Sequence, residues 1–211
     1  MTFLEMRKLF RAYTNDIEAD RWPDTADVNA AKFVNLGQET IQDVIDDADE
    51  DWFMKGFDYP VVPSTDALEF DLPTDYKAAI RAERVVSGDV PIPLDIVKFN
   101  KRHEAPPMGW GYGNVYIRGE KIGVVSPTEA WTLWFWYTKR LPDMTVDGES
   151  CDIPSQWHKL VVLQGARLAY ASEGRDFGVW EGEYQIDMQR LSRFIDRGQR
   201  QQPTYINYVE E

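Results

Sequence analysis

The side chains that could carry nucleophilic chemistry are few in this chain. It holds one cysteine, Cys151, and two histidines, His103 and His158. Cys151 lies in an acidic turn, where neighbouring carboxylates raise the pKa of a thiol and suppress the reactive thiolate. A catalytic dyad needs its two groups in contact, and the spacing of Cys151 and His158 does not establish one. We therefore predict no catalytic residue, and a core or solvent-facing role for the histidine.

Metal-ligand patterns are also weak. The sequence has no Cys-x-x-Cys or His-Glu-x-x-His motif, and zinc needs three or four protein ligands. Asp47, Asp49 and Asp51 take positions 1, 3 and 5 of a calcium loop. Position 6 is Trp52, where the sharp turn needs glycine, and position 12 is Asp58, where a longer Glu normally binds. We interpret the run as a solvated acidic helix end and expect no metal and no cofactor.

Aromatic residues are the most distinctive chemical feature. The stretch Trp131-Thr132-Leu133-Trp134-Phe135-Trp136-Tyr137 is apolar on both faces when extended. Trp134 and Trp136 would share the face opposite to Leu133 and Phe135, and a strand apolar on both faces must be covered on both sides. We expect the helices to cover one side and a neighbouring subunit the other. A platform for sugar rings is the alternative.

Two further segments favour contacts with partners. Trp110 and Tyr112 alternate with glycines in a loop, without the spacing of a nucleotide fingerprint. With Trp134 and Trp136 they are our candidates for a subunit or tail interface. The C-terminal residues Pro203, Tyr205, Ile206 and Tyr208 are typical of a peptide that docks as an added strand. Plain disorder is the alternative for this arm.

The net charge limits the partners further. It is -13, with 36 acidic and 23 basic residues, whereas duplex binding needs cations that neutralise phosphates. An acidic wall could surround passing double-stranded DNA without sequence-specific binding. The first residues lack the apolar core of a signal peptide, and no apolar run is long enough for a membrane span. We expect a protein made in a cytoplasm, with no membrane contact.

The elements that position these residues follow from apolar periodicity. A capping box at Thr2 and Glu5 opens a first helix that ends before Trp22. Further helices are expected near 24–48, 153–171 and 180–197. The middle is predicted to be β-rich, with a hairpin of 114–118 and 121–125 through a two-residue II′ turn at Gly119-Glu120.

The expected fold class is α+β, mostly a helical bundle of two N-terminal and two C-terminal helices, with a β-rich insert and an extended C-terminal arm. Residues 1–211 are expected to form a single domain. Within it, 1–50 and 153–198 form the helical body, 51–152 the insert and 199–211 the arm.

The order of elements and several short motifs resemble the head-to-tail adaptor (connector) proteins of tailed bacteriophages. The motifs are Leu68–Tyr76, Asn114–Ile122 followed by Ser126-Pro127, and Asp152–His158, which resembles the "Ile-Pro, two residues, aromatic-His" helix start of adaptors. The resemblance implies a structural virion protein without enzymatic activity. It also implies a ring, commonly dodecameric, that docks under the portal through the arm and meets tail or nozzle proteins.

Three alternatives stay open at this point. A stopper or tail-completion protein differs from an adaptor only in its partner. A carbohydrate-binding module would be all-β, which the predicted helices disfavour. A glycosidase needs two converging carboxylates, and the abundance of acidic residues makes any pair uninformative without geometry.

Overall fold

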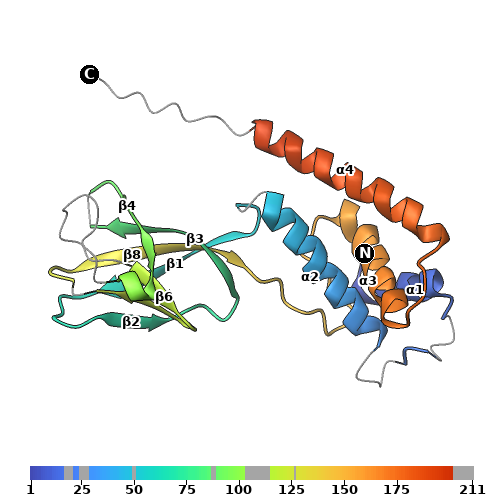
Figure 1. Ribbon diagram of the computed structural model, residues 1–211, viewed down its shortest axis with the longest axis horizontal. Helices are drawn as coiled ribbons and strands as arrows, with labels where there is room; N and C mark the ends of the chain where they lie inside the picture. Colours follow the sequence, from blue (N-terminus) through green and yellow to red (C-terminus); the bar gives the residue numbers. More distant parts are fainter. Residues whose placement is uncertain are drawn as a thin grey trace. The chain divides into compact units, whose positions relative to one another are not determined.

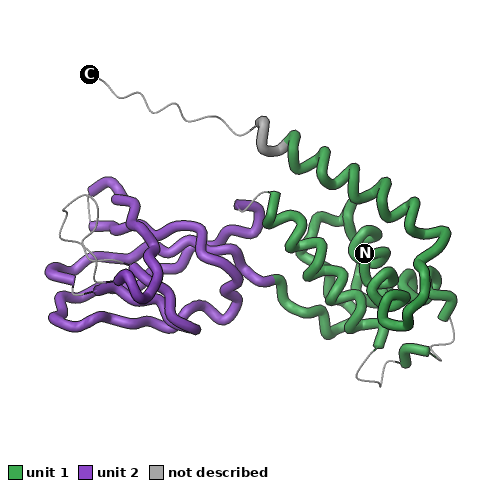
Figure 2. The backbone as a smooth tube through the Cα atoms, viewed as in Figure 1, with its two compact units in different colours: residues 1–49, 141–211 green, residues 50–140 purple. Residues whose placement is uncertain are grey.

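The computed structural model describes residues 1–16, 21–23, 29–48, 51–86, 89–102, 115–125 and 127–201, with 198–201 described by their backbone only. The chain divides into two compact units (Figure 2). Residues 1–49 and 141–211 belong to the helical unit, and residues 50–140 to the β unit. The strands are thus inserted between the second and third helices (Figure 1).

The helical unit is organised around its third helix. Its elements are α1 (Phe3–Thr14), α2 (Ala30–Ala48), the short 3-10 turn η2 (Ser155–Trp157), α3 (His158–Ser172) and α4 (Val179–Gln201). Helices α1, α2 and α4 all contact α3. This explains why α3 buries residues on several sides, including Leu160, Val161, Val162, Leu163 and Ala166.

Helix α1 begins with the predicted capping box. The Thr2 hydroxyl accepts the Glu5 backbone N–H at 3.3 Å, and the Glu5 carboxylate accepts the Thr2 N–H at 2.8 Å. The helix ends at Thr14, earlier than expected. Asn15 takes the left-handed conformation there, with φ of 52°. A residue in this conformation cannot continue a right-handed helix, and asparagine is one of the few residues that adopt it readily.

Helices α2 and α3 cross at a pair of glycines. A Cβ atom at Gly37 would lie 2.3 Å from the Val161 carbonyl oxygen, and one at Gly165 would lie 2.5 Å from the Phe33 carbonyl oxygen. Both contacts are with backbone atoms, which cannot rotate away. The two helix backbones can approach this closely only because neither position carries a side chain.

The segment that returns from the β unit is held by amide side chains along α2. Gln42 accepts the Leu141 N–H at 3.2 Å, and Gln38 donates to the Pro142 carbonyl at 2.9 Å. Asn35 both donates to and accepts from the Met144 backbone, at 3.1 Å each. Gln38 and Gln42 are therefore buried polar residues with their hydrogen bonds satisfied by backbone, as burial requires.

The β unit contains two four-stranded sheets. The first has the order β1-β8-β3-β4 and is antiparallel throughout; its strands are β1 (Met54–Val61), β8 (Trp131–Lys139), β3 (Tyr76–Val85) and β4 (Ile92–Leu94). The second has the order β2-β7-β6-β5; its strands are β2 (Leu68–Asp71), β7 (Lys121–Val124), β6 (Val115–Arg118) and β5 (Ile96–Lys98). Strands β5 and β6 are parallel, and the 3-10 turn η1 (Phe99–Lys101) follows β5.

The two sheets enclose one hydrophobic core. Tyr59, Leu133 and Phe135 from the first sheet pack in one cluster with Ile122 and Val124 from the second. The cover of the inner face of β8 is therefore the second sheet, and our expectation that helices would cover it is wrong.

The hairpin of β6 and β7 is confirmed. Arg118 pairs with Lys121 across the turn, and Gly119 has a φ of 60°. A type II′ turn needs a positive φ at its first central position, where glycine adopts it without strain.

The predicted fold class is partly wrong. The protein is α+β, but it is not mostly a helical bundle, because its described residues form four α-helices and two four-stranded sheets. The sheets have their own hydrophobic core, so they form a second compact unit beside the helical one in the division of the chain. The sequence pattern of short strands did not reveal this, since which strands pair depends on contacts far apart in the chain.

Candidate interaction surfaces

Strand β8 has two aromatic faces with different surroundings. Leu133, Phe135 and Tyr137 are fully buried in the core between the sheets, while Trp134 and Trp136 are half-buried on the opposite face. The predicted alternation is confirmed. Because β1 and β3 both pair with β8, the two indoles lie over the middle of the sheet and not at its edge.

Neighbouring strands surround these tryptophans with polar residues. Asp58 of β1 and Glu83 of β3 flank Trp134 in the register. Gly56 and Arg81 flank Trp136 in the same way. The indoles meet edge to face, with ring centroids 6.4 Å apart and planes at 89°. We call this surface, made of Gly56, Asp58, Arg81, Glu83, Trp134 and Trp136, the tryptophan face.

Trp136 is fixed by three kinds of contact. Its indole N–H donates to the Glu83 carboxylate at 3.0 Å. The Arg81 guanidinium lies 5.1 Å from its ring centroid, within the range of a cation–π contact. Arg81 also pairs with Glu83 at 3.6 Å. Trp134, by contrast, has one described ring contact, with Trp136, so it is the member of the face with most of its contact capacity still available.

Gly56 gives the Trp136 ring its place on the sheet. A Cβ atom at Gly56 would lie 3.0 Å from Cζ3 of the indole, at the limit of what side-chain contacts tolerate. The missing side chain lets the indole lie flat across β1. The orientation of the tryptophan face therefore depends on a glycine in the neighbouring strand.

A partly buried group of polar side chains holds the far end of β8. The Tyr137 hydroxyl donates to Asp75 at 2.7 Å, and Lys55 donates to the same carboxylate at 2.7 Å. Burial, and secondly the bond to Asp75, raises the pKa of Tyr137. Burial opposes ionisation of Asp75, but the bonds from Lys55 and Tyr137 prevail and hold its pKa below the ordinary value. Burial also raises the pKa of Tyr59, on β1, to about 12.

The candidate nucleophile is buried and poorly reactive. Burial raises the pKa of the Cys151 thiol to about 11, and the charge of Asp152 adds to the effect. The sulfur accepts the Ile153 N–H at 3.4 Å. His158 is buried in the core, and its Nε2 lies 2.7 Å from the Ile153 carbonyl oxygen. These contacts are structural, and they leave the thiol protonated at neutral pH.

Several predicted positions lie outside the described residues. They are the loop residues His103, Trp110 and Tyr112, the arm residues Pro203, Tyr205, Ile206 and Tyr208, and Asp49 of the acidic run. Over the described ranges, no three His, Cys, Asp or Glu side chains form a group that could hold a metal ion. None of the helices described is long and apolar enough to cross a membrane.

Sequence reasoning identified the two tryptophans but not their supports. Gly56, Arg81 and Glu83 come from strands that are far from β8 in the chain. Only the pairing register of β1 and β3 with β8 identifies them as neighbours, and the sequence alone does not give that register. By pattern alone, residues 76–86 fit a helix as well as a strand. Only the pairing of β3 with β8 places Arg81 and Glu83 beside the indoles.

The described residues thus present an aromatic face on the first sheet, with Trp136 fixed by Glu83 and Arg81. Comparison with known families matched residues 1–207 to the SU10 adaptor protein. The chain therefore belongs to the SU10 adaptor protein family, and the predicted resemblance to phage adaptors is confirmed. It is a phage structural protein by this membership. No curated protein matched the chain.

Proposed function

We propose that the protein forms a ring at the head-to-tail interface of the virion, docks under the portal and connects it to tail components around the DNA channel. The observation that carries this proposal is the family match over residues 1–207. The tryptophan face supports it, since the half-buried Trp134 and Trp136 lie on the sheet face outside the core and tryptophan is enriched among the anchors of protein interfaces.

Ring closure needs two different surfaces on each subunit, which meet by a repeated rotation. We assign the tryptophan face to one contact, with a neighbouring subunit or with a tail protein. Trp134 would be its main anchor, because the indole N–H of Trp136 already donates a hydrogen bond to Glu83. Trp110 and Tyr112 would add to the same contact from their loop.

The C-terminal arm would attach each subunit to the portal. Pro203, Tyr205, Ile206 and Tyr208 would dock on the portal as an added strand. Repeated around a ring, even a weak arm contact gives strong avidity, because each bound arm holds its neighbours at high local concentration.

The charge fits a passage for DNA better than a binding site. With a net charge of -13, the protein as a whole repels phosphates. Double-stranded DNA would pass the ring without sequence-specific contacts.

The first experiment measures mass by light scattering for the protein alone and mixed with portal rings. We expect about one copy per portal subunit, as a matched ring requires. Deleting residues 203–211 should abolish portal binding and leave the circular dichroism spectrum unchanged. Full portal binding by the truncated chain would refute the docking role of the arm. A chain that does not bind portals but binds another connector would instead favour a stopper or tail-completion protein.

The tryptophan face is tested by Trp134→Ala, with Trp131→Phe as a control inside the core. Truncating an interface anchor typically costs 2 kcal/mol or more of binding, roughly 30-fold. The proposal expects that loss in assembly for Trp134→Ala only, with unfolding unchanged. Saturable binding of a polysaccharide that Trp134→Ala abolishes would instead favour the carbohydrate-binding alternative, which the perpendicular indoles do not favour.

A further inference from the structure

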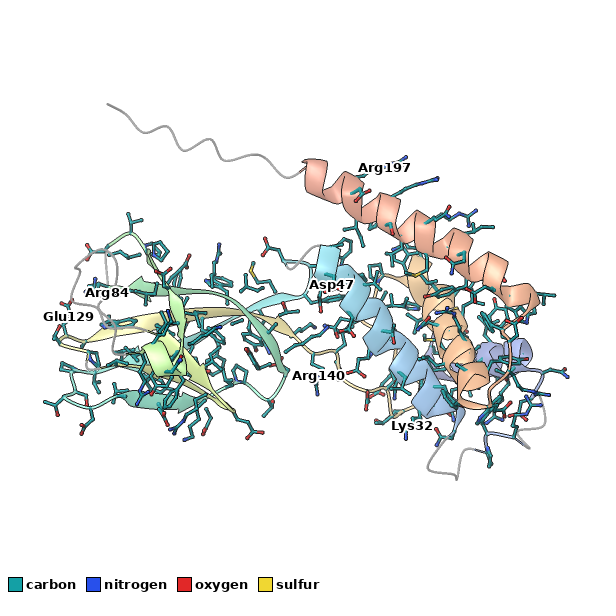
Figure 3. All side chains as sticks on the ribbon, viewed as in Figure 1. Lys32, Asp47, Arg84, Glu129, Arg140 and Arg197 are labelled. Carbon is teal, nitrogen blue, oxygen red and sulfur yellow. The ribbon has the colours of Figure 1, made fainter. Side chains whose placement is uncertain are left out.

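A pocket with three arginines lies between the 3-10 turn η2 and helix α4. It has a volume of about 450 Å³. Its lining residues are Gln156 and Trp157 from η2 and Arg190, Arg193, Phe194 and Arg197 from α4. Figure 3 shows Arg197 near the C-terminal end of α4. We call this site the arginine pocket.

The arginine pocket has an aromatic wall beside its charges. The Trp157 and Phe194 rings have centroids 5.8 Å apart, and Phe194 is 40% exposed. The four residues from α4 share one side of the helix, because they follow the spacing i, i+3, i+4 and i+7. Leu191 and Ile195 of the same helix are buried in the core. The pocket can therefore contact a ligand through both apolar surface and positive charge.

The positive charge of the pocket is only partly balanced by the residues described. Arg190 pairs with Asp187 of its own helix at 2.9 Å. Arg193 and Arg197 make no ion pair with any described residue. Guanidinium groups bind carboxylates through strong, charge-assisted hydrogen bonds. The pocket therefore fits a ligand that carries carboxylates next to apolar or aromatic groups.

The chain itself contains a segment of this chemistry directly after α4. Residues 202–211, which lie outside the described residues, have the sequence Gln-Pro-Thr-Tyr-Ile-Asn-Tyr-Val-Glu-Glu. This segment carries two carboxylates, Glu210 and Glu211, and no lysine or arginine. Tyr205 and Tyr208 supply aromatic rings, which pair favourably with other aromatic rings. The segment is thus complementary to the arginine pocket in charge and in apolar character.

The length of this segment also suits the pocket. Arg190 lies about 16 Å before Gln201 along the axis of α4, at 1.5 Å per residue. A proline at 203 opposes continuation of the helix. If residues 202–204 reverse the chain direction, residues 205–210 span about 20 Å when extended. The glutamates can therefore reach every arginine of the pocket.

We propose that the arginine pocket binds the C-terminal segment 202–211 of its own chain. Glu210 and Glu211 pair with the arginines, and the tyrosines pack on the wall of Trp157 and Phe194. This proposal goes beyond the proposed function, because it concerns the free protein and needs neither a ring nor a portal. The pocket would compete with any partner for the arm.

A segment of the same chain has an advantage over separate ligands. Exposed ion pairs contribute only about 0.2–1 kcal/mol each, so a free peptide of this kind would bind weakly. A short tether, however, holds its ligand at an effective concentration on the order of millimolar. A DNA duplex would meet the acidic excess of the helical unit, since residues 1–49 and 141–211 hold 23 acidic and 12 basic residues. That repulsion opposes phosphate binding.

Hydrogen exchange of residues 205–208 in the full-length protein tests the proposal, with mass spectrometry as the readout. An arm that is docked for more than half of the time exchanges at least about two-fold more slowly than a free chain. R193E/R197E should bring exchange to the free rate, and so should E210R/E211R, which changes only the arm. The variant with all four substitutions should regain the protection, because each attractive pair is restored with its signs exchanged.

The control variant K8E/R175E changes the net charge by the same amount as R193E/R197E. It replaces two exposed cations of the helical unit that do not line the pocket, and it should keep the wild-type protection. Protection should also be lost in about 1 M salt, where exposed ion pairs are screened.

Four outcomes would overturn the proposal. The first is a wild-type arm that exchanges at the free rate, and the second is protection that survives R193E/R197E. The third is protection that rises with protein concentration, which would mean that the arm binds a second copy. The fourth is a DNA duplex retained by the wild type and released by R193E/R197E without any change in the exchange of the arm. None of these measurements involves a portal, so they are independent of the test of portal docking.

Discussion

Replacing Gly165 by alanine tests the close crossing of α2 and α3. The added methyl would lie 2.5 Å from the Phe33 carbonyl oxygen. Since the obstacle is backbone, α2 must move away from α3 as a whole. The variant Gly182→Ala is the matched control, because it adds the same methyl to an exposed position of α4 with nothing within 4 Å.

The expected magnitudes have opposite signs. Alanine gains about 1 kcal/mol over glycine in a helix interior, and Gly182→Ala should retain most of it. At Gly165 the same gain is outweighed by overpacking, which typically costs about 1–3 kcal/mol and more when backbones must shift. We expect Gly165→Ala to lower the free energy of unfolding by about 1–2 kcal/mol, so that the two variants differ by about 2–3 kcal/mol.

Urea unfolding followed by circular dichroism of the helices measures both variants. The midpoint should fall for Gly165→Ala and rise for Gly182→Ala, with an unchanged slope if the unfolded states are alike. Thermal unfolding gives a second measure, at about 2–4 °C for each kcal/mol in a chain of this size. A Gly165→Ala protein as stable as Gly182→Ala would refute the close crossing.

Three further predictions concern other parts of the molecule. Gly56→Val should displace the Trp136 indole and break its bond to Glu83, which a shift in tryptophan fluorescence would report; unchanged fluorescence would contradict the packing. The β unit should lose stability above pH 10, because folding raises the pKa values of Tyr59 and Tyr137 above the ordinary value. Their protonated phenols therefore stabilise the fold fully below pH 10, and this contribution is lost as they ionise at higher pH. Near-ultraviolet circular dichroism against pH measures the loss, and a transition below pH 9 would contradict this reasoning. Asp47→Asn should raise the free energy of unfolding by about 0.3–1 kcal/mol, because it removes a negative charge from the last turn of α2, where the helix dipole is also negative; urea unfolding measures this, and a variant less stable than the wild type would contradict it.

Local chemistry made several features readable from the sequence. The capping box at Thr2 requires only residues three apart, and the II′ hairpin requires only glycine at a defined place between two strands. The alternation that puts Trp134 and Trp136 on one face needs only the two-residue period of a strand. The family resemblance likewise came from short motifs read in order, and the match over residues 1–207 confirms it.

What the sequence could not determine depends on residues that are distant along the chain. The β unit was expected only as an insert in a helical bundle. Its two sheets with a shared core were not predicted, because strand pairing is set by contacts between residues far apart in the chain. For the same reason Gly56, Arg81 and Glu83 were not foreseen as supports of Trp136. The close crossing of α2 and α3 at Gly37 and Gly165 is likewise visible only after folding, because spacing along one helix fixes a face but not what that face meets.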